Sequence, residues 1–361
     1  MMNIFDGLVK DSFWKNEEAL STEYLPKILP HREGEIKLIA KNLIPASRFG
    51  KPQNMFIFGP PGIGKTAVVK FVFRDFEEYS ERVKTVYLNC WDYNTAPSVL
   101  SKLVIELGFF IPRRGVSKDE IKERLIEALR KLKKALIVCL DEVDQLVKKD
   151  SSVLYDLSRL NQYVNVPVGL VLISNDRFAL KDVDARIKST LALQEIEFKP
   201  YSLLEMKDIL WERVKLAFRP GSVEDGVILL IANHAVKQGG DVRIGLECLL
   251  RAARHAEERG SKKVKVGDVK SILGLVKPVK PKIIEARLDE NEKILLEIIK
   301  ERGELETTKA YEEFNKRSEV KLSDRRLRDY LKRLEDLGLV ETELVRGVRG
   351  KRRIVRYKVA S

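Results

Sequence analysis

The sequence predicts an α/β fold with a mostly parallel sheet of five strands, followed by a helical region and a small C-terminal domain. Five short apolar runs alternate with helical patterns over the first 200 residues, which is typical of βα units. Purely helical periodicity follows from about Ser202 to Leu275. Prolines and lysines without apolar periodicity then mark a linker. The expected boundaries are a core over 1–200, a helical lid over 201–276, a linker over 277–287 and a C-terminal domain over 288–361.

Composition narrows the class of protein. With 361 residues, 44% of them apolar, the chain is long enough for two or three globular domains. Its net charge of +13 favours a polyanionic partner, either nucleic acid or a membrane surface. Three scattered cysteines without a CxxC pair argue against disulfides and zinc. Because the sequence has no apolar leader and no run of 18 apolar residues, we expect a soluble cytoplasmic protein that does not associate with a membrane.

The expected strands are four to seven residues long, and several are rich in Val and Ile. They are Gln53–Phe58, Lys84–Cys90, Ala135–Leu140, Val168–Ile173 and Leu193–Phe198. About 45 residues separate the second strand from the third, and they hold two helical patterns, Ala96–Leu107 and Lys118–Leu132.

A phosphate-binding loop follows the first expected strand. Residues 59–66 match the pattern G-x4-G-K-[ST], and a helical pattern comes directly after them. Glycines let backbone N–H groups converge on phosphate oxygens, and the helix N-terminus adds its dipole. Lys65 would reach the β- and γ-phosphates of ATP or ADP, and Thr66 would ligate Mg²⁺. The alternative is a Gly/Pro-rich turn before an ordinary helix. The expected nucleotide contacts here are Gly59, Pro60, Pro61, Gly62, Ile63, Gly64, Lys65, Thr66 and Ala67.

An acidic pair ends the third expected strand. Asp141 would hold Mg²⁺, and Glu142 would polarise the attacking water as general base. Acidic residues often end strands, so the pair alone is a weak signal. It becomes a strong one some 70 residues after a phosphate-binding loop.

Three further polar residues could act on the γ-phosphate. Asn175 ends the fourth strand, where it could sense the phosphate and orient water, although a plain turn asparagine is the alternative. Arg186 could meet a neighbouring subunit's γ-phosphate or its own, or be an isolated surface arginine. Arg243 opens a lid helix and could close over the phosphates, or simply form a salt bridge at the helix start.

These motifs, in this order, resemble an AAA+ ATPase, and more narrowly the archaeal origin-recognition initiators. Residues 24–33 are similar to the L-P-x-R-E box of that family, which lies along the adenine. The extra helix before the acidic pair resembles the insertion specific to initiators. Its loop carries Phe109, Phe110, Arg113 and Arg114.

The resemblance implies an AAA+ core, a helical lid and a C-terminal winged-helix domain. The resemblance also implies that Asn175 is sensor 1, Arg186 the arginine finger and Arg243 sensor 2. The family often has Asp-Pro-Arg before the finger, whereas Ala185 stands there in this chain, which leaves open whether Arg186 acts in cis or in trans. Slow, regulatory ATP hydrolysis is expected. Adenine nucleotide contacts are further implied for His31, Arg32, Tyr201, Arg213 and Arg243.

The C-terminal domain predicts a winged helix. Three helical patterns, roughly 289–302, 307–318 and 323–337, precede two strands around 339–345 and 352–359. Between Leu344 and Ser361 there are seven basic residues and no acidic one, and the strands are joined by a Gly-containing tip. This wing suits phosphates or a minor groove, and the third helix suits a major groove.

The expected DNA contacts lie on the helix, the wing and the insertion loop. On the third helix, Arg333 is also expected on the charged outer face. A solvated charged face on a protein-binding winged helix is the alternative. The candidate contacts are Arg113, Arg114, Arg325, Arg326, Arg328, Lys332, Arg346, Arg349, Lys351, Arg352 and Arg353.

Together these features predict an ATP-dependent replication initiator that binds double-stranded origin DNA and helps to load the replicative helicase. ATP or ADP with Mg²⁺ is the expected cofactor. A second copy or a paralogous initiator is a further expected partner on DNA. The alternative is a nucleotide-switch ATPase in signalling or transcription whose winged helix binds protein.

Overall fold

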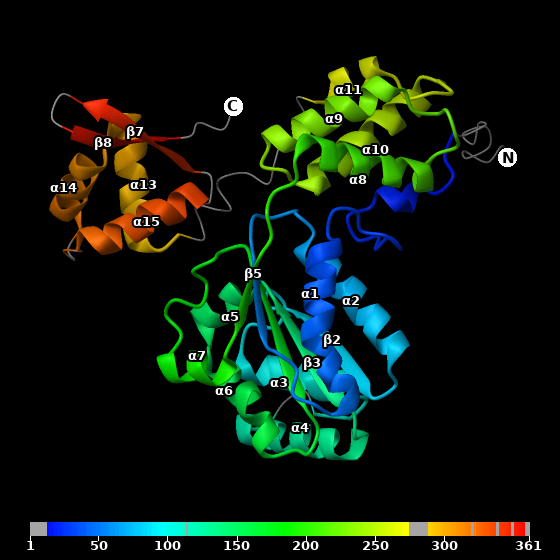
Figure 1. The fold of residues 1–361 in the computed structure, drawn as a ribbon, viewed down its shortest axis with the longest axis vertical. Helices are drawn as coiled ribbons and strands as arrows, with labels where there is room; N and C mark the ends of the chain where they lie inside the picture. Colours follow the sequence, from blue (N-terminus) through cyan, green and yellow to red (C-terminus); the bar gives the residue numbers. More distant parts are fainter. Residues whose placement is uncertain are drawn as a thin grey trace. The chain divides into compact units, whose positions relative to one another are not determined.

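The computed structural model describes residues 13–112, 115–273, 288–318, 321, 323–336, 339–347 and 350–357. The chain forms two compact units, Met1–Val276 and Lys277–Ser361. Each unit is described by itself (Figure 1).

A five-stranded parallel sheet lies at the centre of the first unit. Its order is β2-β3-β4-β1-β5, and every neighbouring pair is parallel. Strands β3 and β4 are buried along their whole length because helices cover both faces, which explains their continuous apolar sequences. The predicted α/β fold with a parallel sheet is confirmed. The strands are β1 (Met55–Phe58), β2 (Val83–Asn89), β3 (Ala135–Asp141), β4 (Val168–Ser174) and β5 (Gln194–Glu197).

Helices cover the two faces of this sheet unequally. Helices α1 and α2 pack on one face through Ile39, Val69 and Val72, in the same apolar cluster as Ile57 of β1. Helices α3, α4 and α6 pack on the other face, in a second apolar cluster. The helices of this part are α1 (Glu33–Leu43), α2 (Lys65–Tyr79), α3 (Ala96–Glu106), α4 (Lys118–Leu132), α5 (Val143–Lys149), α6 (Ser152–Arg159) and α7 (Ala185–Leu191), with short 3₁₀ turns at Glu17–Leu20, Ile44–Arg48 and Leu160–Gln162.

The two helices predicted between the second and third strands are present as α3 and α4. Thr95 begins α3 with a capping box, in which its side chain accepts from Ser98 N–H. In the loop after α3, Phe109 packs against the core while Phe110 is 83% exposed. Arg113 and Arg114 of the same loop lie outside the described residues.

The lid consists of α8 (Leu203–Ala217), α9 (Asp225–Lys237), α10 (Val242–Glu258) and α11 (Val266–Ile272). Helix α8 begins with a capping box between Ser202 and Glu205. The segment before the core packs on the end of the same helix, where Trp14 stacks on Phe218 with ring centroids 4.6 Å apart. Apolar side chains of lid and core belong to one continuous cluster, so the lid is anchored to the core by hydrophobic packing.

The second unit contains the three predicted helices and the predicted hairpin. A further short strand, β6, was not predicted and makes a three-stranded antiparallel sheet of order β6-β8-β7. The last helix packs on the core of this unit through Leu327, Leu331 and Leu334, which are buried. The elements are α13 (Glu290–Arg302), β6 (Glu304–Glu306), α14 (Thr307–Arg317), α15 (Asp324–Asp336), β7 (Val340–Gly347) and β8 (Gly350–Tyr357).

One residue of α15 differs from its expected place. The sequence put Arg333 on the outer, charged face, but its side chain is only 19% exposed and donates to Glu292 of α13 at 2.6 Å. Glu292 is completely buried, and a buried carboxylate needs a cationic or hydrogen-bonding partner. That requirement from another helix draws Arg333 inward, which the periodicity of α15 alone could not reveal.

Candidate nucleotide site

The phosphate-binding loop connects β1 to α2 at the carboxyl edge of the sheet. Gly59, Gly62 and Gly64 have φ values of 147°, 73° and 91°, in the region that L side chains rarely adopt. A Cβ atom on Gly59 would lie 2.3 Å from the carbonyl oxygen of Phe198. Only glycine fits there, so the loop can turn tightly and present its N–H groups at the N-terminus of α2, which carries a partial positive charge.

Lys65 lies inside this loop. Its ammonium donates to the carbonyl oxygens of Gly59 and Pro60, both at 2.7 Å, and to Asn175 Oδ1 at 2.8 Å. Burial lowers the pKa of Lys65 from 10.5 to about 8, and Arg243 lowers this pKa too, whereas the nearby acidic pair raises it. The buried ammonium is therefore held at a fixed point beside the ends of β1 and β4.

The carboxylate of Asp141 accepts three hydrogen bonds from residues of the site. Thr66 donates its hydroxyl to Asp141 Oδ2 at 2.6 Å, and Tyr87 donates to the same oxygen at 2.8 Å. The main-chain N–H of Glu142 donates to Asp141 Oδ1 at 2.8 Å. Sequence reasoning missed Tyr87. The sequence signal was present, since Tyr87 lies near the end of a strand, but its use requires knowing that β2 and β3 are neighbours.

Glu142 and Asn175 complete the cluster. Glu142 has φ 54° and ψ 43°, a left-handed conformation that is uncommon for a residue with a side chain and that recurs at functional sites. Asn175 donates its amide to Glu142 Oε1 at 2.7 Å while its Oδ1 accepts from Lys65. A continuous chain of hydrogen bonds thus joins Lys65, Asn175 and Glu142. The structure brings these predicted residues together with Thr66 and Asp141.

Arg243 lies at the start of α10 and is paired with Asp241. The guanidinium donates to Asp241 Oδ2 at 2.6 Å, and Asp241 also accepts from Arg243 N–H as the N-cap. The hydrogen bond to Asp241 raises the pKa of Arg243. The helix-start salt bridge, which the sequence left open as the alternative, is therefore present. The preceding N–H, that of Val242, donates to the carbonyl of Gly62 at 3.0 Å and joins the lid to the phosphate-binding loop.

Arg32, in the L-P-x-R-E box, donates hydrogen bonds to the phosphate-binding loop and to the end of the core. It is buried and donates to the carbonyl oxygens of Ile63 and Lys199 at 3.0 and 2.8 Å. Its guanidinium also lies 4.0 Å from the ring centroid of Tyr201 and donates to the hydroxyl of that residue. Arg32 and Tyr201, both predicted nucleotide contacts, thus meet beside the loop.

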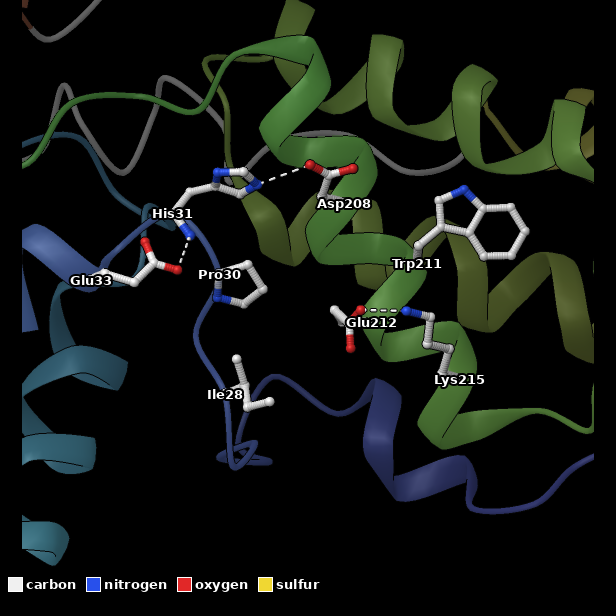
Figure 2. A pocket seen from close by; sticks show the side chains of 8 residues that line it. All are labelled: Ile28, Pro30, His31, Glu33, Asp208, Trp211, Glu212 and Lys215. Atoms are coloured by element: carbon white, nitrogen blue, oxygen red, sulfur yellow. Dashed lines mark hydrogen bonds and ion pairs between the residues drawn. The ribbon is translucent and has the colours of Figure 1, made fainter.

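His31 faces an open pocket of about 530 Å³ between the box and α8 (Figure 2). It has a left-handed φ of 62°, and its Nε2 lies 3.0 Å from Asp208 Oδ2 of the lid. Ile28 and Pro30 line the pocket from the box, and Trp211 lines it from α8. The box therefore contacts the lid through His31 and the phosphate-binding loop through the adjacent Arg32.

The structure does not bring two further predicted residues into this cluster. Arg213 is buried and donates to the carbonyl oxygens of Ala19 and Tyr24 at 2.9 and 3.1 Å, in the segment before the core. Arg186 has a side chain 89% exposed and pairs with Asp184, the N-cap of α7, at 3.0 Å. Their roles stay predictions.

The predicted DNA contacts are only partly described. The side chains of Arg325, Arg326, Arg328 and Lys332 are exposed on α15, and that of Arg353 is exposed on β8. The backbone of Arg346, Lys351 and Arg352 belongs to the β7–β8 hairpin. Arg349, like the two arginines of the α3–α4 loop, lies outside the described residues.

Neither a membrane-spanning helix nor a metal-binding cluster is present in the described ranges. In that part of the chain, no helix is both long and apolar enough to cross a membrane. The same residues contain no group of three His, Cys, Asp or Glu side chains arranged to hold a metal ion by themselves.

Two family models match the first unit. The AAA domain model matches residues 48–179, and the model of the Cdc6 AAA+ ATPase-type lid domain matches residues 207–272. The first match covers β1 through β4 with the phosphate-binding loop, the acidic pair and Asn175. The second covers most of the lid. Together with the geometry above, they identify an AAA+ ATPase.

Relatives extend the likeness to the whole chain. The ORC1-type DNA replication protein 1 of Archaeoglobus fulgidus is 41% identical over 275 residues, which are 74% of this chain and 67% of that protein. The protein of the same name from Sulfurisphaera tokodaii is 34% identical over 369 residues, 99% of this chain and 93% of the relative.

Among solved structures, that of the Aeropyrum pernix ORC1 protein in complex with DNA is similar, with 31% identity and a TM-score of 0.69. The match covers 97% of this chain and 94% of that one. Sequence and structure therefore agree over both units. The chain belongs to the family of ORC1-type DNA replication proteins.

Proposed function

We propose that this protein is an ATP-controlled initiator that binds duplex origin DNA and helps to recruit the replicative helicase, together with a second copy or a paralogous initiator. The observation that carries the nucleotide part is the chain of hydrogen bonds from Lys65 through Asn175 to Glu142, beside the Thr66–Asp141 contact. The DNA part is supported by family membership and by the Aeropyrum pernix ORC1 protein, whose structure was solved with DNA.

ATP or ADP binds with its phosphates in the loop between β1 and α2. The loop N–H groups and the N-terminus of α2 surround the phosphates, and Lys65 supplies a positive charge at their base. Arg32 and Tyr201 hold the loop from the side. Arg243 follows Val242, whose N–H donates to Gly62, and by leaving Asp241 it would supply a second positive charge from the lid.

The residues present fit magnesium. Mg²⁺ prefers oxygen ligands and binds through one or two protein groups together with substrate phosphates. The hydroxyl of Thr66 and the carboxylate of Asp141 are such groups, and their oxygens lie 2.6 Å apart at the start of α2. These two residues would hold the ion, which when bound neutralises charge on the phosphates.

Hydrolysis uses Glu142 as general base. Asn175 donates to one oxygen of the Glu142 carboxylate and fixes its orientation, so that the carboxylate can accept a proton from water that attacks the γ-phosphate. Arg186 is exposed on α7, where a neighbouring subunit can approach it. Its action in trans would make hydrolysis depend on assembly, consistent with a slow regulatory ATPase.

The second unit binds DNA as a winged helix. Three helices followed by the β7–β8 hairpin are the arrangement expected of that fold. Helix α15 exposes Arg325, Arg326, Arg328 and Lys332, a density of cations suited to the phosphates and base edges of a major groove. The hairpin carries the basic wing, which adds phosphate or minor-groove contacts.

The test is footprinting and affinity measurement on genomic fragments with ATP, ADP and no nucleotide. The wild type should prefer origin repeats over random duplex, and the preference should depend on the nucleotide. Lys65→Ala should lose that dependence, while Lys41→Ala, an exposed lysine of α1, should behave as wild type. Equal affinity for origin and random duplex would overturn the initiator proposal. A nucleotide response that survives in Lys65→Ala would overturn the proposed nucleotide site.

A further inference from the structure

Tyr87 brings a third element of the fold to the acidic side of the nucleotide site. It lies on β2, at the edge of the sheet, opposite Cys139 in the register with β3. Its ring is packed against the core, and Lys70 of α2 lies 4.3 Å from the ring centroid. The ring is thus held on both sides, and only its hydroxyl points to the end of β3, where it meets Asp141.

The two oxygens of the Asp141 carboxylate have different partners. Oδ1 accepts from the main-chain N–H of Glu142, which fixes one end of the carboxylate. Oδ2 accepts from two hydroxyls, those of Thr66 and Tyr87. A hydroxyl has one hydrogen and two lone pairs, so Thr66 can ligate a cation with its oxygen while its hydrogen stays on Asp141. In the proposed mechanism Tyr87 contacts neither a phosphate nor the magnesium ion, and its hydroxyl donates only to the Asp141 carboxylate.

We infer that Tyr87 is a positioning residue for magnesium, whose hydroxyl holds the Asp141 carboxylate with Oδ2 turned toward Thr66. The inference rests on the proposed magnesium–nucleotide site. Two contacts to Oδ2 from opposite elements, α2 and β2, prevent the carboxylate from rotating about its Cβ–Cγ bond. Groups that orient a metal ligand in this way typically contribute 10- to 100-fold to metal affinity.

Tyr87→Phe is the matched change, because it removes one hydroxyl and leaves the packed ring and the net charge as they are. The control is Tyr79→Phe on α2, the same change at a side chain that is 67% exposed. Affinity for a fluorescent ADP is measured first in excess EDTA and then during a Mg²⁺ titration. Mn²⁺ binding to the ADP complex, followed by electron paramagnetic resonance, gives a second readout of the ion alone.

In EDTA all three proteins should bind ADP equally within about twofold. In Tyr87→Phe the Mg²⁺ concentration at half effect and the Mn²⁺ dissociation constant should both rise about tenfold, and in Tyr79→Phe neither should change. An unchanged Mg²⁺ midpoint in Tyr87→Phe overturns the inference while leaving the magnesium site standing. An equal loss in EDTA and in Mg²⁺ shows a structural role and also overturns it. A wild type without any Mg²⁺ response overturns the magnesium site itself.

Discussion

The charged side chains of the nucleotide site and those of α15 are arranged in opposite ways. Lys65 and Asp141 are 6% and 5% exposed, and each is bound by neighbours at 2.6 to 2.8 Å. Arg325 and Arg326 are exposed on the surface of α15. A buried ion needs its partners in place, so its position is set before any ligand arrives. An exposed cation takes its final geometry from the polyanion it meets.

This difference predicts different kinds of mutational response. Substitutions in the buried cluster should have large effects, and each should affect either nucleotide binding or hydrolysis but not both. Changes on the exposed face should be small, roughly additive and dependent on salt. Four experiments test the contrast.

The largest effect is expected for Glu142→Gln. The amide keeps the size of the side chain and can still contact Asn175, but it cannot accept the proton from water. ATP hydrolysis should fall by at least about 100-fold while ATP affinity changes less than about threefold. Single-turnover hydrolysis and equilibrium binding check the two numbers separately. A parallel loss of binding would show that Glu142 supports the loop and is not the base.

The next effect separates two arginines of one helix. Arg333→Ala removes the cationic partner of the fully buried Glu292 and leaves it the N–H of Asp289, which should cost about 3 kcal/mol and speed amide hydrogen exchange in α13 and α15. Arg326→Ala, at an exposed position of the same helix, should leave exchange unchanged. Mass-spectrometric exchange on the full-length variants is the measurement. Similar exchange in both variants would mean that the Arg333–Glu292 pair adds no stability.

A third experiment uses pH. Burial lowers the pKa of Lys65 to about 8, so the side chain is protonated below that pH and loses its charge as pH rises through it. Nucleotide binding above pH 8 must then take up a proton, and ADP affinity should fall by up to about tenfold per pH unit. Calorimetry from pH 7 to 9.5 measures this fall. Lys65→Arg keeps its charge over this range, so its profile should be flat whatever its absolute affinity. A wild-type profile as flat as that of the variant would contradict the prediction.

The smallest effect is expected at the exposed face. Arg326→Ala should weaken DNA binding a few-fold and reduce the slope of log affinity against log salt by about one, if the residue contacts one phosphate. DNA-binding titrations at salt concentrations from about 50 to about 200 mM measure the slope of log affinity against log salt. A loss that depends on DNA sequence but not on salt would indicate a base contact for Arg326.

Sequence alone could predict the elements whose signals are local. The glycine loop, the helix after it and the buried strands follow from residues close together in the chain. The partners of Asp141 could not be predicted in full, because Tyr87 is 54 residues away and reaches it only through the pairing of β2 with β3. For the same reason the inward turn of Arg333 depends on a carboxylate from another helix.

Strand β6 was missed for a different reason. Strand β6 is three residues long, Glu-Leu-Glu, and such a short charged run carries no period that distinguishes it from a turn. Arg213 was assigned to the nucleotide through family resemblance alone; the structure shows its contacts with the segment before the core, and its role at the nucleotide stays a prediction. A resemblance transfers a role, whereas the local contacts of a side chain depend on what this chain packs around it.

The hydrogen bond from Val242 to Gly62 has a mechanical consequence. It joins the start of α10 directly to the phosphate-binding loop, where the side chain of Asp241 also packs against Gly62. A displacement of the loop by a fraction of an ångström is therefore transmitted to a helix of 17 residues, about 25 Å long. If the helix tilts as a rigid rod about this contact, its far end moves further than the loop itself.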